Sequence, residues 1–157
     1  MQKITPCLWF NNHAEDAMNF YISVFKNSQK VSITRYGEAG PGTKGTVMTA
    51  RFLIEGKEFV ALNGGPVFTF SPAISFVVNC ETQEEVDRLW QKLSNGGEKQ
   101  QCGWLKDKFG VSWQIVPVVL VEMLNDPDPV KSQRVMKAML PMGKIDSKIL
   151  KQAYNGK

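Results

Sequence analysis

The hydrophobic pattern of this chain switches between a strand period and a helix period, and the same order of segments occurs twice. The first copy begins with an apolar strand at 4–10 and an amphipathic helix at 12–25. The second copy begins with a strand at 73–78 and a helix at 82–93. In each copy further strand-like segments follow, the last of them introduced by a glycine. The pattern predicts two tandem β-α-β-β-β units.

Both predicted helices have an apolar side and a capping signal. The apolar side chains recur at the spacing of one helix face, and they are Ala14, Ala17, Met18, Tyr21, Val24 and Phe25 in the first helix and Val86, Leu89, Trp90 and Leu93 in the second. Asn12 and Thr82 are each followed by a glutamate, Glu15 and Glu85, at capping-box spacing. The glycines after Asn95 end the second helix.

The remaining strands of the first copy surround a glycine-rich loop. Strands are expected at 31–36 and 46–54, and the loop between them, 37–45, contains four glycines and one proline. This composition is typical of a mobile segment, interpreted either as a structural turn or as a flap at a pocket mouth. In the second copy the matching strands are compressed into 100–109. The last strands of the two copies are expected at 56–62 and 110–116.

A helical extension follows Pro117. Asp128 followed by Pro129 predicts the start of one helix, and Asp146 predicts the start of another, with Ile145 and Leu150 as a hydrophobic staple. We therefore expect a domain at 1–117, with units at about 1–65 and 71–117, and a C-terminal extension at 118–157 that packs on the domain or on a partner subunit.

The predicted fold class is α+β, with the two units forming a curved mixed-sheet cup. One β-α-β-β-β unit cannot cover both faces of its own sheet. Two copies side by side would therefore leave a groove in which a ligand lies. A length of 157 residues is enough for one compact domain with a substantial core.

Composition and charge exclude several classes of function. The chain is 43% hydrophobic and 22% charged, as in ordinary globular proteins. No apolar run has the length of a membrane span, and the first residues lack the apolar core of a signal peptide, so we expect a cytoplasmic protein with no membrane partner. The three cysteines, Cys7, Cys80 and Cys102, lack zinc-ligand spacing and fit reduced thiols.

Positive charge is concentrated near the C-terminus. From residue 130 onward, seven Lys and Arg residues stand against the single acid Asp146, whereas the whole chain carries a net charge of +4. A basic tail can meet nucleic acid, but no aromatic residues alternate with these lysines as single-strand binding requires. The preferred interpretation is the solvated face of C-terminal helices, without a nucleic-acid partner.

Several blocks of sequence extend this interpretation. They are Thr5–Phe10 with Phe20 and Tyr21, Leu62–Pro66, Cys102–Pro117, Met142–Asp146, and Ala153 with Tyr154. Through them the chain resembles the vicinal oxygen chelate superfamily (glyoxalase, bleomycin-resistance and extradiol-dioxygenase relatives), most closely its PhnB-like branch. Some members of this branch carry a demethylubiquinone methyltransferase name. This chain has no strand, glycine-rich turn and helix of the kind that a nucleotide-like cofactor needs.

The resemblance implies four inward metal-ligand positions, on the first and last strands of each unit. They fall on Pro6, Ala73, Val60 (or Leu62, if the register slips) and Gln114. Only Gln114 has a side-chain donor atom, and a divalent ion needs three or four donors. The one histidine, His13, lies at the start of the first helix. We therefore expect no metal site and no cofactor.

The groove is expected to be apolar with few polar groups. Strand alternation turns Ser112 and Val116 inward together with Gln114, and turns Trp113 and Ile115 to the helix side. The expected ligand-binding residues are Arg51, Asn63, Phe68, Ser75, Trp104 and Gln114. Such a lining is typical of a small-molecule pocket. The alternative is a groove filled by side chains or by a partner subunit.

Three residues are candidates for catalysis. Cys102, near Lys106 and Lys108, is a candidate nucleophile, although no histidine is at hand to act as its base. Asp107 with Gln114 would form an acid–base pair. The segment from Asp107 to Gly110 equally fits a turn between two strands, and this is the preferred interpretation.

Two classes of function remain open. The first is a metal-independent small-molecule-binding protein of the glyoxalase/bleomycin-resistance type. The second is an enzyme of the same superfamily, an isomerase, lyase or transferase that acts on a small metabolite through Cys102, Asp107 or Gln114. A structural dimer module without a ligand is a third possibility. By the resemblance, and because the extension offers spare apolar surface, we expect a homodimer.

Overall fold

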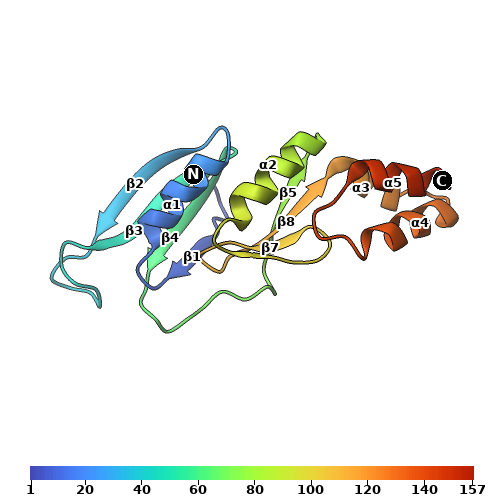
Figure 1. Ribbon diagram of the computed structural model, residues 1–157. Helices are drawn as coiled ribbons and strands as arrows, with labels where there is room; N and C mark the ends of the chain where they lie inside the picture. The colour runs from blue at the N-terminus through green and yellow to red at the C-terminus, as the bar shows by residue number, and fades with distance from the viewer. The chain divides into compact units, whose positions relative to one another are not determined.

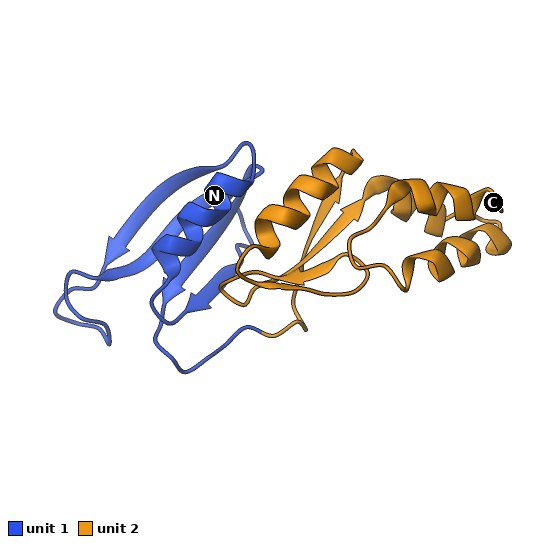
Figure 2. Ribbon diagram, viewed as in Figure 1, with its two compact units in different colours: residues 1–70 blue, residues 71–157 orange.

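The computed structural model describes residues 1–157, and the chain divides into two compact units. Residues 1–70 form unit 1 and residues 71–157 form unit 2 (Figure 2). Each unit contains one β-α-β-β-β motif with its own four-stranded mixed sheet (Figure 1). The predicted fold class, two tandem units of this kind followed by a helical extension, is confirmed. No helix has both the length and the hydropathy to cross a membrane.

Unit 1 has strand order β1-β4-β3-β2, with β1 parallel to β4 and the other neighbours antiparallel. Its elements are β1 (Cys7–Phe10), α1 (Ala14–Val24), β2 (Gln29–Arg35), β3 (Val47–Ile54) and β4 (Lys57–Asn63). Helix α1 lies across one face of the sheet and leaves the other face open (Figure 1). The helix-covered face is the core, where the Phe52 ring stacks between Tyr21 and Phe59.

The start of α1 differs from the sequence prediction. The N-cap residue is His13, which makes no side-chain cap, and Asn12 does not cap the helix. The backbone N–H of Ala14 instead donates to Asn63 Oδ1 at 2.9 Å, so the acceptor comes from the end of β4. A helix needs acceptors for its first free N–H groups, and any polar side chain that reaches them serves. Here the tertiary fold supplies it.

Unit 2 repeats the topology, with strand order β5-β8-β7-β6 and with β5 parallel to β8. Its motif consists of β5 (Phe76–Cys80), α2 (Gln83–Ser94), β6 (Glu98–Lys99), β7 (Trp104–Lys106) and β8 (Ser112–Pro117). The predicted N-cap of α2 is confirmed, because Thr82 Oγ1 accepts from Glu85 N, and the Glu85 side chain accepts in turn from Glu81 N, one residue before the cap. Helix α2 ends at Asn95, before a left-handed Gly96.

Three helices complete unit 2. They are α3 (Val118–Leu124), α4 (Pro129–Met139) and α5 (Ser147–Tyr154). The predicted caps are confirmed: Asp128 accepts from Val130 N, and Asp146 accepts from the first N–H groups of α5. The predicted staple of Ile145 with Leu150 is also present, since both side chains are fully buried. Helix α3 lies in the predicted helical extension, although no separate helix start was predicted for it.

The three helices share an apolar core and are fastened to the rest of unit 2. The core side chains are Leu120, Met123, Val135, Ile145 and Leu150. Gln83, in the first turn of α2, donates to Ile145 O and accepts from Ser147 N. Lys144 forms an ion pair with Asp87 on α2. The extension therefore packs on its own unit through both apolar and polar contacts.

Candidate functional site

The open face of the unit 2 sheet gathers three of the residues that the sequence points to. Gln114 lies on β8, between Trp104 on β7 and Val77 on β5 in the strand register. Its amide Nε2 donates to Ser75 Oγ at 2.9 Å. Strand alternation holds as predicted, because Trp113 and Ile115 point to the α2 side and are buried. Ser75, Trp104 and Gln114 therefore belong to one surface.

This surface carries both apolar and polar side chains around the amide–hydroxyl pair, since Asn79 and Lys106 share it by strand register. Val77 is 51% exposed, and Val116, on the same face as Gln114, is half-buried. Strand β8, which carries Gln114, is paired on both sides, with β5 and with β7, whereas β5 is an edge strand of the sheet. Aromatic and aliphatic side chains beside a few fixed polar groups are the usual lining of a small-molecule site.

The open face of the unit 1 sheet contains Arg51. Its guanidinium is paired with Glu58 on the neighbouring strand β4, with Nε 2.8 Å from Glu58 Oε1. Val60 and its alternative Leu62, one of the two positions proposed for a metal ligand in this unit, are on the same face by alternation and are half-buried. The face thus combines an ion pair with aliphatic surface.

An aromatic pair lies at one edge of the same face. The rings of Trp9 on β1 and Phe68 meet edge to face, with centroids 5.0 Å apart. The Trp9 indole N–H donates to Gly65 O at 2.9 Å, which fixes the ring. A Cβ on Gly64 would come within 2.3 Å of the indole, so only glycine lets the chain pass this close. Phe68, 61% exposed, is an accessible wall.

Asn63 lies on the other side of the unit 1 sheet from Arg51. Besides accepting from Ala14 N, it donates through Nδ2 to Val47 O at 3.1 Å. Both ends of its amide are therefore engaged in joining β4 to α1 and β3. The structure places Asn63 on the helix side and not among the inward polar groups, and its side chain has a structural task.

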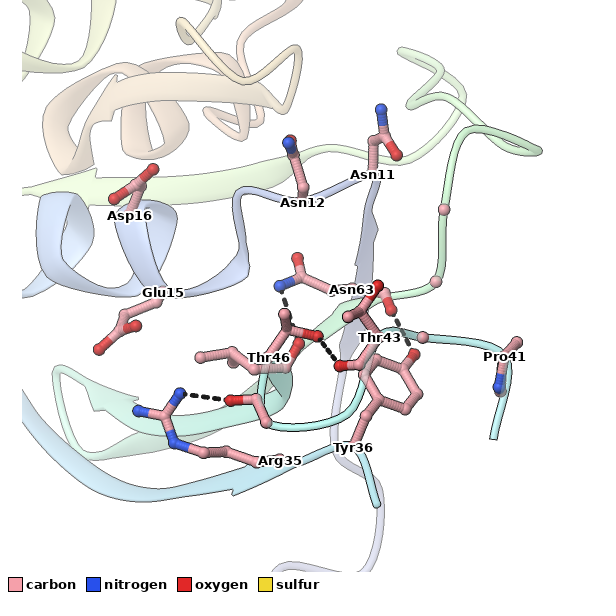
Figure 3. Close-up of a pocket in the computed structure, with 15 residues that line it drawn as sticks. Asn11, Asn12, Glu15, Asp16, Arg35, Tyr36, Pro41, Thr43, Thr46 and Asn63 are labelled. Carbon is pink, nitrogen blue, oxygen red and sulfur yellow. Dashed lines mark hydrogen bonds between the residues drawn. The ribbon is translucent and has the colours of Figure 1, made fainter. Parts of the chain in front are cut away.

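A polar pocket of about 660 Å³ lies within unit 1 (Figure 3). Three separate segments line it: 11–16 at the start of α1, 35–47 from the end of β2 through the glycine-rich loop, and 63–65 after β4. Dashed lines in Figure 3 mark the bonds that fix its walls, among them Tyr36 Oη to Asn63 O at 2.5 Å and Arg35 Nη1 to Gly45 O at 3.1 Å.

The glycine-rich loop, residues 37–45, forms one wall of this pocket because it wraps around the Tyr36 ring. A Cβ built on Gly42 would lie 2.2 Å from that ring, and one on Gly40 would lie 3.2 Å from it. Tyr36 is only 8% exposed as a result. Of the two interpretations of this loop, the structure favours the one in which it borders a pocket.

Cys102 lies in a strained turn that is bonded to the C-terminal extension. Its φ is +56°, and its backbone N–H donates to Met142 O at 2.7 Å. The next residue, Gly103, also has a positive φ, and its N–H donates to Gly143 O. The Cys102 thiol is oriented toward the backbone carbonyl of Leu140, at 3.6 Å. These contacts give the turn a structural role in docking the extension.

Asp107 is buried and holds the turn that the sequence suggested. Its Oδ1 accepts from the backbone N–H groups of Phe109 and Val111, at 2.9 and 3.0 Å. Its Oδ2 accepts from the indole N–H of Trp113 at 2.9 Å. With 2% exposure, this carboxylate organises the β7–β8 connection.

The residues present do not fit the metal site of the superfamily. No group of three or more His, Cys, Asp or Glu side chains is gathered anywhere in the chain. Of the four positions that correspond to metal ligands, Pro6, Ala73 and Val60 (or Leu62) offer no side-chain donor, and the Gln114 amide is bonded to Ser75. Carboxylate or imidazole donors would be needed in these places.

The sequence predicted one residue of the unit 1 pocket, Asn63, as ligand-binding, but not the pocket itself or the Trp9 ring. The signal for Trp9 was present, because alternation with the buried Leu8 and Phe10 sends it to the open face. For the pocket, Tyr36 directly before a loop with four glycines was the available clue. Glu15 was treated only as part of a capping box, yet it lines this pocket.

The comparisons with known proteins agree with this fold. A family model described as 3-demethylubiquinone-9 3-methyltransferase matches residues 2–116, which leaves α3–α5 outside the match. A solved structure of a PhnB protein from Bacillus cereus, whose description proposes a 3-demethylubiquinone-9 3-methyltransferase, is 46% identical, with a TM-score of 0.68, and covers 74% of this chain and 99% of its own. No curated protein matches the chain.

Two more distant structures share the fold alone. Protein PA1353 from Pseudomonas aeruginosa is 22% identical with a TM-score of 0.63, and covers 74% of this chain and 98% of its own. The fosfomycin resistance protein FosX from Listeria monocytogenes, solved with Mn(II) and sulfate, is 15% identical with a TM-score of 0.52. The match covers 74% of this chain and 91% of the FosX chain. Family match and relatives together show that the chain belongs to the 3-demethylubiquinone-9 3-methyltransferase family, in the PhnB-like branch of the vicinal oxygen chelate superfamily.

Proposed function

We propose that this chain is a small-molecule-binding protein that holds its ligand on the open face of the unit 2 sheet and needs no metal ion. The observation that carries the proposal is the cluster of Ser75, Trp104 and Gln114 on one face of the sheet, beside the exposed Val77. The indole offers a flat apolar contact, and the amide and hydroxyl offer hydrogen bonds that orient a ligand. Arg51 and Phe68 are proposed separately, as ligand contacts on the open face of the unit 1 sheet.

The side-chain atoms around Gln114 that could coordinate a metal ion are too few, which supports ligand binding without a metal. An amide oxygen alone is a weak ligand for a divalent ion, and the neighbouring Val77 and Val116 cannot add to it. The same amide is well suited to a carbonyl, hydroxyl or ring nitrogen of an organic ligand, because it presents both donors and an acceptor.

The contacts of Cys102 and Asp107 support binding over catalysis. The Asp107 carboxylate receives three hydrogen bonds inside a turn, and the Cys102 thiol faces backbone carbonyls. Neither group is presented to a ligand on the open face of β7 and β8. The enzyme interpretation is left with Gln114, which has no proton to exchange near neutral pH.

A thermal-shift screen of the full chain against metabolites and antibiotics tests the proposal. We expect at least one apolar or aromatic compound to stabilise the protein, and its Kd to be unchanged after dialysis against EDTA. The variant Gln114→Leu should weaken that Kd by about tenfold, since a lost hydrogen bond in an apolar site costs about 1–1.5 kcal/mol. Gln29→Leu, an exposed strand position on β2, is the matched control.

Two results would overturn the proposal. One is a screen in which no compound stabilises the protein. The other is a hit that binds Gln114→Leu and the wild type equally well. Turnover of the hit would show an enzyme in place of a binding protein. We further propose that the protein is cytoplasmic and forms a homodimer. Light scattering at micromolar concentration tests the dimer.

A further inference from the structure

We propose that the polar pocket of unit 1 is a second ligand site, for a small zwitterion of the amino-acid class. In this assignment Glu15 holds the ammonium group and Arg35 holds the carboxylate. The site lies apart from the surface of unit 2 to which the proposed function is assigned, and nothing in that function requires it.

The cavity has the size of a ligand site. Its volume of about 660 Å³ falls within the roughly 300–1,000 Å³ of small-molecule pockets. Few apolar side chains line it, chiefly Val47 and Pro41. The volume and the charged side chains of Glu15, Asp16 and Arg35 in the lining favour a small occupant with charged groups.

The two charged walls face each other without touching. Glu15, in the first turn of α1, points toward Arg35 at the end of β2 (Figure 3). No ion pair joins them, and the Glu15 carboxylate has no hydrogen-bond partner. Asp16, the neighbouring acid, is engaged by His13. An unpaired carboxylate and a guanidinium that share one cavity are satisfied together by a ligand with both charges.

Arg35 has donors to spare. Only its Nη1 makes a hydrogen bond within the protein, to Gly45 O, and this bond orients the guanidinium plane. The remaining N–H groups are available for a carboxylate, which a guanidinium recognises with two parallel hydrogen bonds. A fixed orientation lowers the entropy cost of binding.

The rest of the wall is preorganised. Thr46 Oγ1 donates to Thr43 O, Tyr36 Oη donates to Asn63 O, and Asn63 Nδ2 donates to Val47 O. These groups are held in place before a ligand arrives, and the side chains of Asn11 and Asn12 at the rim are exposed. Because the two walls carry opposite charges, a molecule whose charges are all of one sign should bind more weakly than a zwitterion.

Isothermal titration calorimetry of the full chain tests this inference. The probes are the standard L-amino acids. Putrescine, which carries positive charges only, and glutarate, which carries negative charges only, serve for comparison. We expect at least one amino acid to bind at least about tenfold more tightly than putrescine or glutarate. Ligand contact with the loop 37–45 should also slow its cleavage by protease.

Variants separate the site from general effects. Glu15→Gln and Arg35→Gln should each weaken amino-acid binding by about tenfold or more, since each removes one charge-assisted contact. Glu84→Gln is the matched control for the first, because Glu84 is an exposed acid at the same position of α2, and Lys30→Gln on β2 is the control for the second. All four positions carry polar surface, so the variants should fold.

The outcomes are decisive in both directions. Loss of binding in the two site variants, with both controls at wild-type affinity, supports the inference. It is overturned if no amino acid binds, if putrescine or glutarate binds as tightly, or if Glu15→Gln and Arg35→Gln bind normally. Gln114→Leu should leave amino-acid binding unchanged, so failure here and failure of the proposed function are distinguishable.

Discussion

Replacing Asp107 by alanine should destabilise unit 2 strongly, although this residue was a candidate for catalysis. The side chain accepts three hydrogen bonds, from Phe109 N, Val111 N and Trp113 Nε1. Val111 and Trp113 are 2% and 3% exposed, so water cannot replace the carboxylate at their N–H groups. Phe109 N is only partly buried and can be hydrated.

The size of the effect follows from the two buried N–H groups, of Val111 and of the Trp113 indole, that would lose their acceptor. A buried N–H left without an acceptor costs about 1–3 kcal/mol, so Asp107→Ala should lower the free energy of unfolding by about 4 kcal/mol. Asp107→Asn keeps one oxygen for the two backbone donors but turns an NH₂ group toward the Trp113 indole, and should lose about 2 kcal/mol.

Urea unfolding followed by tryptophan fluorescence and circular dichroism measures both values. In a Trp113→Phe background the indole N–H is absent, so Asp107→Asn should cost clearly less there than in the wild type. A loss below about 1 kcal/mol for Asp107→Ala, or no coupling between the two positions, would refute the structural role given to this carboxylate.

Three further predictions concern other contacts. Asn63→Ala should cost about 2 kcal/mol in urea unfolding, because it removes both the acceptor for Ala14 N and the donor to Val47 O, whereas Asn63→Asp should keep the first and lose less. Gly42→Ala should displace the loop 37–45 from the Tyr36 ring and speed its cleavage in limited proteolysis; an unchanged cleavage rate would contradict the packing described. Burial, with a smaller effect of Glu85, raises the pKa of Cys80 from 9.0 to about 12. The unfolded thiol then ionises first, so the free energy of unfolding should fall as pH rises from about 9 toward about 12, and less in Cys80→Ala.

Local signals were reliable where the physical cause is local. The caps at Thr82, Asp128 and Asp146 act within three residues of the helix start, and all were predictable from the sequence. The faces of β8 were predictable for the same reason, since alternation turns Trp113 and Gln114 to opposite sides.

Signals failed where the partner is distant in sequence. The acceptor at the start of α1 comes from Asn63, 49 residues beyond Ala14, so no motif near Asn12 could reveal it. The pocket of unit 1 is likewise built from three separate segments. Its two oppositely charged residues, Glu15 and Arg35, belong to two of them. Such an arrangement exists only after the chain has folded.

Helix α3 lies in the predicted helical extension, although its own composition favours a strand. The segment begins Val118-Val119-Leu120-Val121, and β-branched residues favour extended structure. The helix forms because Leu120 and Met123 enter the apolar core shared with α4 and α5. Tertiary packing here outweighs local propensity.

The central claim is that a small organic molecule binds to the unit 2 surface through Gln114 without help from a metal. The most direct test is the Kd of the best compound from the screen, measured by calorimetry on EDTA-dialysed protein before and after adding Mn²⁺ or Zn²⁺, in the wild type and in Gln114→Leu. We predict one Kd for the wild type under all conditions and a weaker one for the variant. Binding that appears only when a metal is added, or that ignores the loss of Gln114, would contradict the claim.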